Sequence, residues 1–266
     1  MIIGISGLIS SGKDTVAECI QAFDCWHNQY AKKLTEFEDC DDIQFCKLML
    51  ERKFRGENDF HKKHTSWSNK KFATKLKQIA SILFDCNAED WENIDFKNSP
   101  LPPEWQVEGE ETRTYRHALI TIGTECIRDH YNQNAWILSM FNQYKTIADK
   151  YPDGHYSNIC SICGKIENNC NKRMTICRKC FELDSYPKWI ISDARFFNEI
   201  NAIKERGGYM VRVDRGDLTL KHSSELEWQS YNDWDFIIDN SGDYEHLIKQ
   251  VKDMLIKFRI INTVVC

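Results

Sequence analysis

A glycine loop near the N-terminus constrains the fold of this chain more than any other feature. From Gly7 to Thr15 the sequence reads GLISSGKDT. The apolar run Ile2–Ile5 precedes it and is typical of a buried strand, while apolar residues follow it at helical spacing. Between a strand and a helix, such a loop surrounds a phosphate with backbone N–H groups, and its lysine reaches the outer phosphates. The segment therefore predicts a phosphate-binding loop.

One position departs from the usual loop pattern. The residue after the lysine is normally Ser or Thr, whose hydroxyl holds Mg²⁺. Here that residue is Asp14, and Thr15 follows it. Two alternatives stay open: Asp14 meets the metal through water, or Thr15 supplies the hydroxyl.

Composition narrows the class of protein. The 266 residues suffice for one domain with insertions, or for one domain and a small satellite. The net charge of −5 argues against a general nucleic-acid binder, which would carry a basic stripe. The sequence contains no run of 18 apolar residues, so we expect no membrane span, and we also expect no signal peptide. The chain combines a predicted phosphate-binding loop with twelve cysteines, which indicates a reducing compartment. We therefore expect a cytoplasmic protein whose cysteines bind metal rather than form disulfides.

Later segments complete an α/β pattern. Apolar runs at 189–191, 209–213 and 236–238 read as buried strands, and residues 247–256 read as an amphipathic closing helix. We expect a parallel sheet of about five strands with helices on both faces. Ligands of such sheets lie at the carboxyl ends of the strands. Asp193 stands at one of these ends, where a carboxylate orders Mg²⁺ and its waters, and Arg195 follows close behind.

A cysteine array predicts a zinc site. Two C-x₂-C pairs are separated by thirteen residues, a pattern that suits tetrahedral Zn²⁺ in a structural site. The predicted ligands are Cys160, Cys163, Cys177 and Cys180, with Cys170 as a spectator. Two disulfides or an emptied site are the alternatives. We expect residues 151–184 to form a zinc-binding insertion, and docking of a protein partner there stays open.

Several motifs, in order, resemble those of the phage-type deoxynucleoside monophosphate kinases, a family of P-loop kinases. The loop ends in Gly-Lys-Asp, and later segments match Ala-x-x-Leu-Lys, Thr-x-Arg, Gly-Thr-Glu, Asp-x-Arg-Phe-x-Asn-Glu and His-x-Ser-Glu, the last at 222–225. The resemblance covers about 1–23, 70–142 and 187–256. It implies a kinase core of residues 1–150 and 185–266, interrupted by an inserted segment at 24–68 and by the zinc insertion.

The resemblance implies ATP-dependent phosphorylation of deoxynucleoside monophosphates to diphosphates, with ATP and Mg²⁺, and a viral or phage-like origin with action in the host cytoplasm. The catalytic candidates are Lys13, Arg128, Asp193 and Arg195. The ATP-binding candidates are Gly7, Ser10, Ser11, Gly12, Lys13, Asp14, Thr15 and Asn240, with Asn240 in a turn that touches adenine in related kinases. The substrate-binding candidates are Lys77, Lys97, Arg116, Glu125, Trp136 and Arg215.

Two other functions stay open. The chain is then either a different small-molecule P-loop kinase, of the phosphomevalonate or dephospho-coenzyme A type, or an inactive kinase fold that binds a partner through its zinc segment. The expected partners are small nucleotides rather than nucleic acid or membrane, and a homodimer stays open.

The cysteine array gives a direct prediction. Elemental analysis of the purified chain should find about one zinc per molecule, because four thiolates at this spacing close a tetrahedral site. Metal-free protein with full activity would contradict this expectation.

Overall fold

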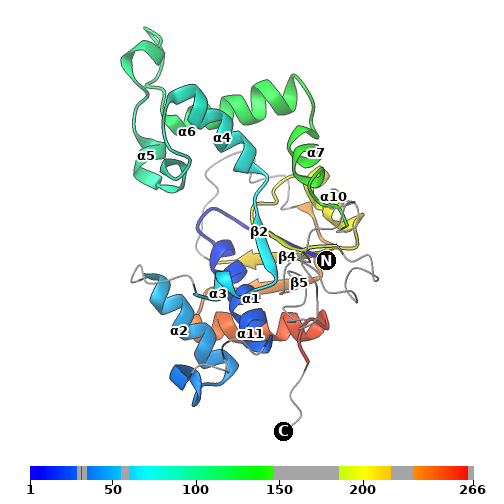
Figure 1. Cartoon of the computed structure of the whole chain (residues 1–266). Coiled ribbons are helices and arrows are strands. Elements are labelled where there is room, and N and C mark those ends of the chain that lie inside the picture. Colours follow the sequence, from blue (N-terminus) through cyan, green and yellow to red (C-terminus); the bar gives the residue numbers. More distant parts are fainter. Residues whose placement is uncertain (29–30, 32–34, 55–59, 147–185, 217–229, 263–266) are drawn as a thin grey trace, which may run out of the picture. The chain divides into compact units, whose positions relative to one another are not determined.

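The computed structural model describes residues 1–28, 31, 35–54, 60–146, 186–216 and 230–262 (Figure 1). The chain divides into two compact units. We call residues 1–70 with 144–266 the sheet unit, and residues 71–143 the helical unit. The predicted zinc ligands Cys160, Cys163, Cys177 and Cys180 lie outside the described residues, as does the segment at 222–225.

The sheet unit alternates strands and helices. Its strands are β1 (Ile2–Ser6), β2 (Trp67–Lys70), β3 (Lys188–Ile191), β4 (Tyr209–Asp214) and β5 (Phe236–Asp239). Its helices are α1 (Lys13–His27), α2 (Asp42–Phe54), α3 (Phe60–Lys63), α10 (Phe197–Lys204) and α11 (Tyr244–Lys257), with a 3₁₀ turn at Thr35–Phe37.

The strands form one five-stranded sheet in the order β2-β3-β1-β4-β5. Every neighbouring pair is parallel. Ile191 of β3 lies opposite both Gly4 and Lys70, so the carboxyl ends of β1, β2 and β3 meet at one edge. The predicted α/β fold with a parallel sheet of about five strands is confirmed.

Strand alternation assigns the two faces of the sheet. Ile3 and Ile5 belong to a core that α1, α2 and α11 cover, and Figure 1 shows these three helices together on one side of the strands. Helix α10 packs on β1 and β4, with Ile200 and Ile203 completely buried. Helices thus cover both faces, which is the arrangement that parallel sheets require.

The segment 24–68 contributes to this core. Its residues Ile43, Cys46 and Leu50 recur at a spacing that predicts a helix, and the structure has the helix α2 there. Phe45 is fully buried, and its ring packs perpendicular to the Phe37 ring with centroids 5.0 Å apart. The strand β2 begins at Trp67, inside the segment. Whether the segment is an insertion relative to a kinase core stays a prediction.

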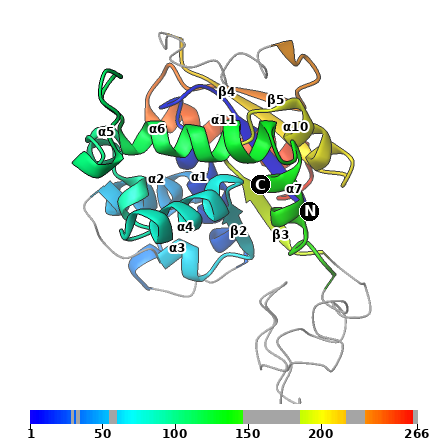
Figure 2. The same cartoon turned by 90° about the horizontal axis from the view of Figure 1, so that it is seen from above.

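The helical unit has no strand longer than an isolated bridge among its residues 71–143. Its helices are α4 (Ala73–Phe84), α5 (Ile94–Asn98), α6 (Tyr115–Ile120) and α7 (Ala135–Phe141). Short 3₁₀ turns span Asp90–Glu92 and Pro103–Trp105, and a π-helix spans Thr121–Asp129. Figure 2 shows α6 and the π-helix as one continuous rod.

Aromatic rings pack together inside the helical unit. Trp91 is completely buried and packs nearly perpendicular to the Phe96 and Tyr115 rings. Phe96 and Tyr115 stack with centroids 4.3 Å apart, and Phe84 joins the cluster. Because aromatic pairs add to the energy of burial, this cluster fixes α4, α5 and α6 against one another.

None of the helices in the described part of the chain combines the length and apolar character that a membrane crossing needs.

Candidate phosphate-binding site

The glycine loop joins β1 to α1 and has an unusual backbone. Ser10 and Gly12 have φ angles of 66° and 99°, both in the left-handed region. A Cβ atom on Gly12 would lie 2.3 Å from Nδ2 of Asn240. Only glycine meets both demands at this position, since other residues pay for the left-handed conformation and would collide with Asn240.

Side chains hold the carbonyl oxygens of the loop. Lys13 Nζ donates to the carbonyls of Gly7 and Leu8, at 2.8 and 2.5 Å. From the ends of β4 and β5, Arg215 Nη1 donates to the carbonyl of Ser10 at 3.3 Å, and Asn240 Nδ2 donates to that of Ser11 at 2.7 Å. Four loop carbonyls are therefore engaged by cationic or amide groups, which fixes the course of the loop over the start of α1.

The site fits an anion. Gly12 is the N-cap of α1 and supplies no capping side chain, so the first N–H groups of the helix depend on another partner. The Ser11 hydroxyl is buried and makes no hydrogen bond within the described residues. Phosphate is bound by groups of this kind: backbone N–H donors, the positive end of a helix dipole, a hydroxyl without a partner and an ammonium such as that of Lys13.

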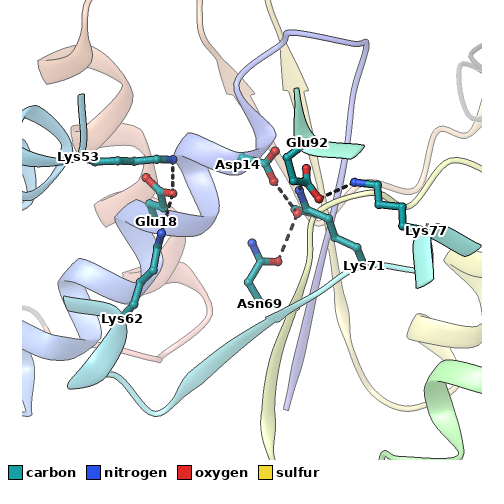
Figure 3. A network of polar contacts seen from close by, with 9 residues as sticks. Asp14, Glu18, Lys53, Lys62, Asn69, Lys71, Lys77 and Glu92 are labelled. Atoms are coloured by element: carbon teal, nitrogen blue, oxygen red, sulfur yellow. Dashed lines mark hydrogen bonds and ion pairs between the residues drawn. The ribbon is translucent and has the colours of Figure 1, made fainter. Parts of the chain in front are cut away.

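A second group of polar side chains lies beside α1. The Ser192 hydroxyl, immediately after β3, lies 2.9 Å from Asp14 Oδ1 and 3.2 Å from Asn69 Oδ1. Figure 3 shows Asp14 and Asn69 pointing toward this common point. The sequence prediction included Asp14 but missed Ser192 and Asn69.

The turn after β3 is held by a buried carboxylate. Oε2 of Glu199 accepts hydrogen bonds from the backbone N–H groups of Arg195 and Phe196, at 2.8 and 3.2 Å. This contact orders the turn that carries Asp193 and Arg195, and both of these side chains are half-buried. The guanidinium of Arg195 forms no hydrogen bond or ion pair with a described residue, which leaves it available to an anion.

The same region has the donors that Mg²⁺ prefers. Asp14, Thr15 and Asp193 offer carboxylate and hydroxyl oxygens, and Mg²⁺ takes oxygen ligands. The described residues contain no cluster of three or more His, Cys, Asp or Glu side chains able to hold a metal. Magnesium in nucleotide sites needs no such cage, because one or two carboxylates act with substrate phosphates and water. The donor set fits.

Basic side chains gather around one carboxylate in the helical unit. Lys77 Nζ lies 2.5 Å from Glu92 Oε1, and Lys71 Nζ lies 4.0 Å from Oε2 (Figure 3). Burial, followed by the charges of Lys77 and Arg116, lowers the pKa of Lys97. Burial acts to raise the pKa of Glu92, but the hydrogen bond and charge of Lys77 outweigh it, and that pKa is lowered. Three lysines thus share one carboxylate, and Arg116 lies near one of them, which favours binding of a further anion.

Two predicted residues, Glu125 and Arg128, lie on the π-helix, and a third, Trp136, contacts it from α7. Arg128 is half-buried, whereas Glu125 is exposed. The indole of Trp136, on α7, donates to the carbonyl of Gly123 at 2.9 Å. Trp136 therefore braces the π-helix, and π-helical turns are frequent at functional sites.

The predicted site residues thus fall into two sets. The sheet unit brings together the glycine loop, Asp14, Asn240 and Arg215, and it places Asp193 and Arg195 after β3. The helical unit brings Lys77 and Lys97 near Glu92, and Arg116 near Lys97. Glu92 was not among the predicted residues, because its contact with Lys77, fifteen positions earlier in the chain, leaves no local signal in the sequence.

Comparison with known proteins gives a partial similarity. No family model matches the chain. Over 64 residues the chain is 38% identical to a protein of Acanthamoeba polyphaga mimivirus whose provisional name is deoxynucleotide monophosphate kinase. The chain is similar there to a nucleotide kinase. The alignment covers 23% of this chain and 33% of the viral protein, so the chain spans about a third of the length of the relative it matches.

The packing of Gly12 gives a testable prediction. Gly12→Ala should lower the free energy of unfolding by about 2–4 kcal/mol, because a left-handed alanine is strained and its methyl group displaces Asn240. In an Asn240→Ala background the same change should cost only about 1–2 kcal/mol, since backbone strain alone remains. Urea unfolding followed by circular dichroism measures both. Equal costs in the two backgrounds would show that Gly12 and Asn240 are not packed together.

Proposed function

We propose that this protein transfers the γ-phosphoryl group of ATP to a deoxynucleoside monophosphate, giving ADP and the deoxynucleoside diphosphate. The observation that carries the proposal is the glycine loop, whose carbonyls are tied back by Lys13, Arg215 and Asn240 at the uncapped start of α1. Such a loop is suited to a phosphate chain rather than to a neutral ligand.

The donor nucleotide belongs to the sheet unit. The loop amides and Lys13 bind the β- and γ-phosphates, with Ser10, Ser11 and Thr15 around them. Asn240 and Arg215 keep the loop in its binding conformation through their hydrogen bonds to Ser11 and Ser10. Lys13 donates to two loop carbonyls, and phosphate oxygens are stronger partners for its charge.

Magnesium accompanies ATP in this proposal. Asp193, with Asp14 or Thr15, would hold the ion and its waters. When bound, Mg²⁺ neutralises charge on the β- and γ-phosphates. The oxygen donors of these side chains support the assignment.

The acceptor phosphate belongs to the basic cluster of the helical unit. Lys77, Lys97 and Arg116 supply the positive charge, and the planar guanidinium of Arg116 offers two parallel donors to a phosphate. Its Nε now donates to Asn98 Oδ1 at 2.9 Å, which holds the side chain in place. Glu125, Trp136 and Arg215 complete the proposed acceptor residues.

The reaction needs no covalent intermediate with the protein. An oxygen of the acceptor's phosphate attacks the γ-phosphorus, and the bond from that phosphorus to the β–γ bridging oxygen breaks as ADP leaves. Charge on the transferring group spreads over its equatorial oxygens, where Lys13, Arg128 and Arg195 provide stabilisation. The protein acts by positioning and by electrostatics.

The partial similarity to the mimivirus protein supports a nucleotide acceptor over the phosphomevalonate and dephospho-coenzyme A alternatives. A panel of acceptors with ATP separates these functions. Phosphorylation of deoxynucleoside monophosphates is the expected result. Transfer only to a non-nucleotide acceptor would replace the proposal, and background turnover with every acceptor would favour an inactive binding protein.

Lys13 provides the sharpest test of the donor site. Lys13→Ala should lower kcat by about a hundredfold or more, because it removes charge that stabilises the transition state. The fold should remain, since the side chain is only half-buried. Lys249→Ala is the matched control: it removes a lysine from a surface ion pair with Glu245 in the same unit and should leave kcat unchanged. Near-normal turnover of Lys13→Ala would contradict the assignment.

The basic cluster gives a separate prediction for the acceptor. Lys77→Ala should raise the KM for the deoxynucleoside monophosphate about tenfold or more, because a charge-assisted contact to phosphate contributes about 1.5–3 kcal/mol. The KM for ATP should stay within about twofold. Lys75→Ala, on the same helix but exposed, is the control and should change neither constant. Equal effects on both KM values would remove Lys77 from the acceptor site.

A further inference from the structure

Ser192 occupies a buried position between two polar groups. Its side chain is 2% exposed, and its hydroxyl lies within hydrogen-bond distance of oxygens on Asp14 and Asn69. The shorter contact, 2.9 Å, is to the Asp14 carboxylate. A buried hydroxyl donating to a carboxylate is among the stronger neutral-to-ionic hydrogen bonds in proteins.

The number of available protons fixes the direction of each hydrogen bond among Asn69, Ser192 and Asp14. A serine hydroxyl has one proton and so donates to one acceptor at a time, whereas both neighbouring atoms are oxygens. The amide of Asn69 can turn by 180° about its last torsion and present nitrogen in place of oxygen. Every group then has a partner: the Asn69 amide donates to Ser192, and the Ser192 hydroxyl donates to Asp14.

The sheet places these residues together. Trp67 and Ile190 belong to the core beneath α1, and two residues further on come Asn69, within β2, and Ser192, directly after β3. Because side chains alternate between faces, Asn69 and Ser192 also lie on the α1 face. Asp14 is the second residue of α1, so the start of that helix meets the ends of β2 and β3.

We infer that Ser192 is a positioning residue that orients Asp14 toward the magnesium of the bound nucleotide. The inference rests on the proposed function. The sequence left open whether Asp14 or Thr15 meets the metal, and the contacts favour Asp14. Its carboxylate is oriented by the hydrogen bonds from Asn69 to Ser192 and from Ser192 to Asp14, whereas the Thr15 hydroxyl makes no hydrogen bond to a described residue. Asp14 thus takes the place of the usual loop hydroxyl, and Ser192 with Asn69 sets the direction of its carboxylate.

Calorimetry on the full chain tests this assignment without measuring activity. The affinity for ADP is measured in EDTA and again in excess Mn²⁺, and the ratio of the two reports the contacts that the protein makes to the metal. Ser192→Ala should leave the affinity in EDTA within about twofold, because the loop amides are intact. It should lower the Mn²⁺ enhancement about tenfold, the typical effect of losing a group that orients a metal ligand.

Three further variants make the result decisive. Ser192→Thr keeps the hydroxyl and should retain the enhancement, and Ser192→Cys, which keeps the volume but donates weakly, should lose it. Asp14→Asn should lose it as well, with no further loss when combined with Ser192→Ala. Ser66→Ala is the matched control, because it breaks a 2.9 Å serine–aspartate contact with Asp24 in the same unit and should change neither affinity.

The outcomes separate this inference from the proposed function. A wild-type enhancement in Ser192→Ala, or no enhancement in the unaltered chain that still binds ADP, overturns the inference and leaves the nucleotide site standing. Absence of ADP binding by the unaltered chain in both conditions overturns the proposed function itself.

Discussion

The position of the loop between β1 and α1 is the constraint on which the candidate site depends. A loop that exposes N–H groups to an anion must have its carbonyl oxygens bound elsewhere, because buried backbone groups without partners are costly. Here Lys13, Arg215 and Asn240 bind those carbonyls. Two of the three come from the ends of β4 and β5, so the loop has its shape only when the sheet is assembled.

The parallel sheet explains why distant segments supply one site. All five strands run in the same direction, so their carboxyl ends collect at one edge. Residues near 14, 69, 192, 215 and 240 follow or adjoin those ends and reach the same place. Helices on both faces fix the strands, and the resulting edge is preorganised before a ligand arrives, which is the condition for electrostatic stabilisation.

Much of the fold could be predicted from sequence because its signals are local. The Ile2–Ser6 strand, the glycine loop and α1 follow from apolar spacing and loop chemistry within a few residues. The helix inside the segment 24–68 also follows from its period, but its packing against α1 and α11 does not, since period gives a face and not a partner.

The missing parts of the site depend on contacts between segments far apart in sequence. Ser192 and Asn69 meet Asp14 only through strand register, and single polar residues beside a strand give no local signal. Asn240 was expected at the adenine by resemblance, and the structure adds a hydrogen bond to the loop carbonyl of Ser11. Glu92 pairs with Lys77 across fifteen positions, which a helical period cannot reveal.

The central claim is that the glycine loop binds the phosphates of ATP. Titration of the isotopically labelled chain with ATP and Mg²⁺, followed by amide NMR, measures this directly. The account predicts saturable shifts of the Gly7, Gly12 and Lys13 amide resonances, because their N–H groups surround the phosphates. Resonances of these residues that stay unchanged at millimolar nucleotide would contradict it.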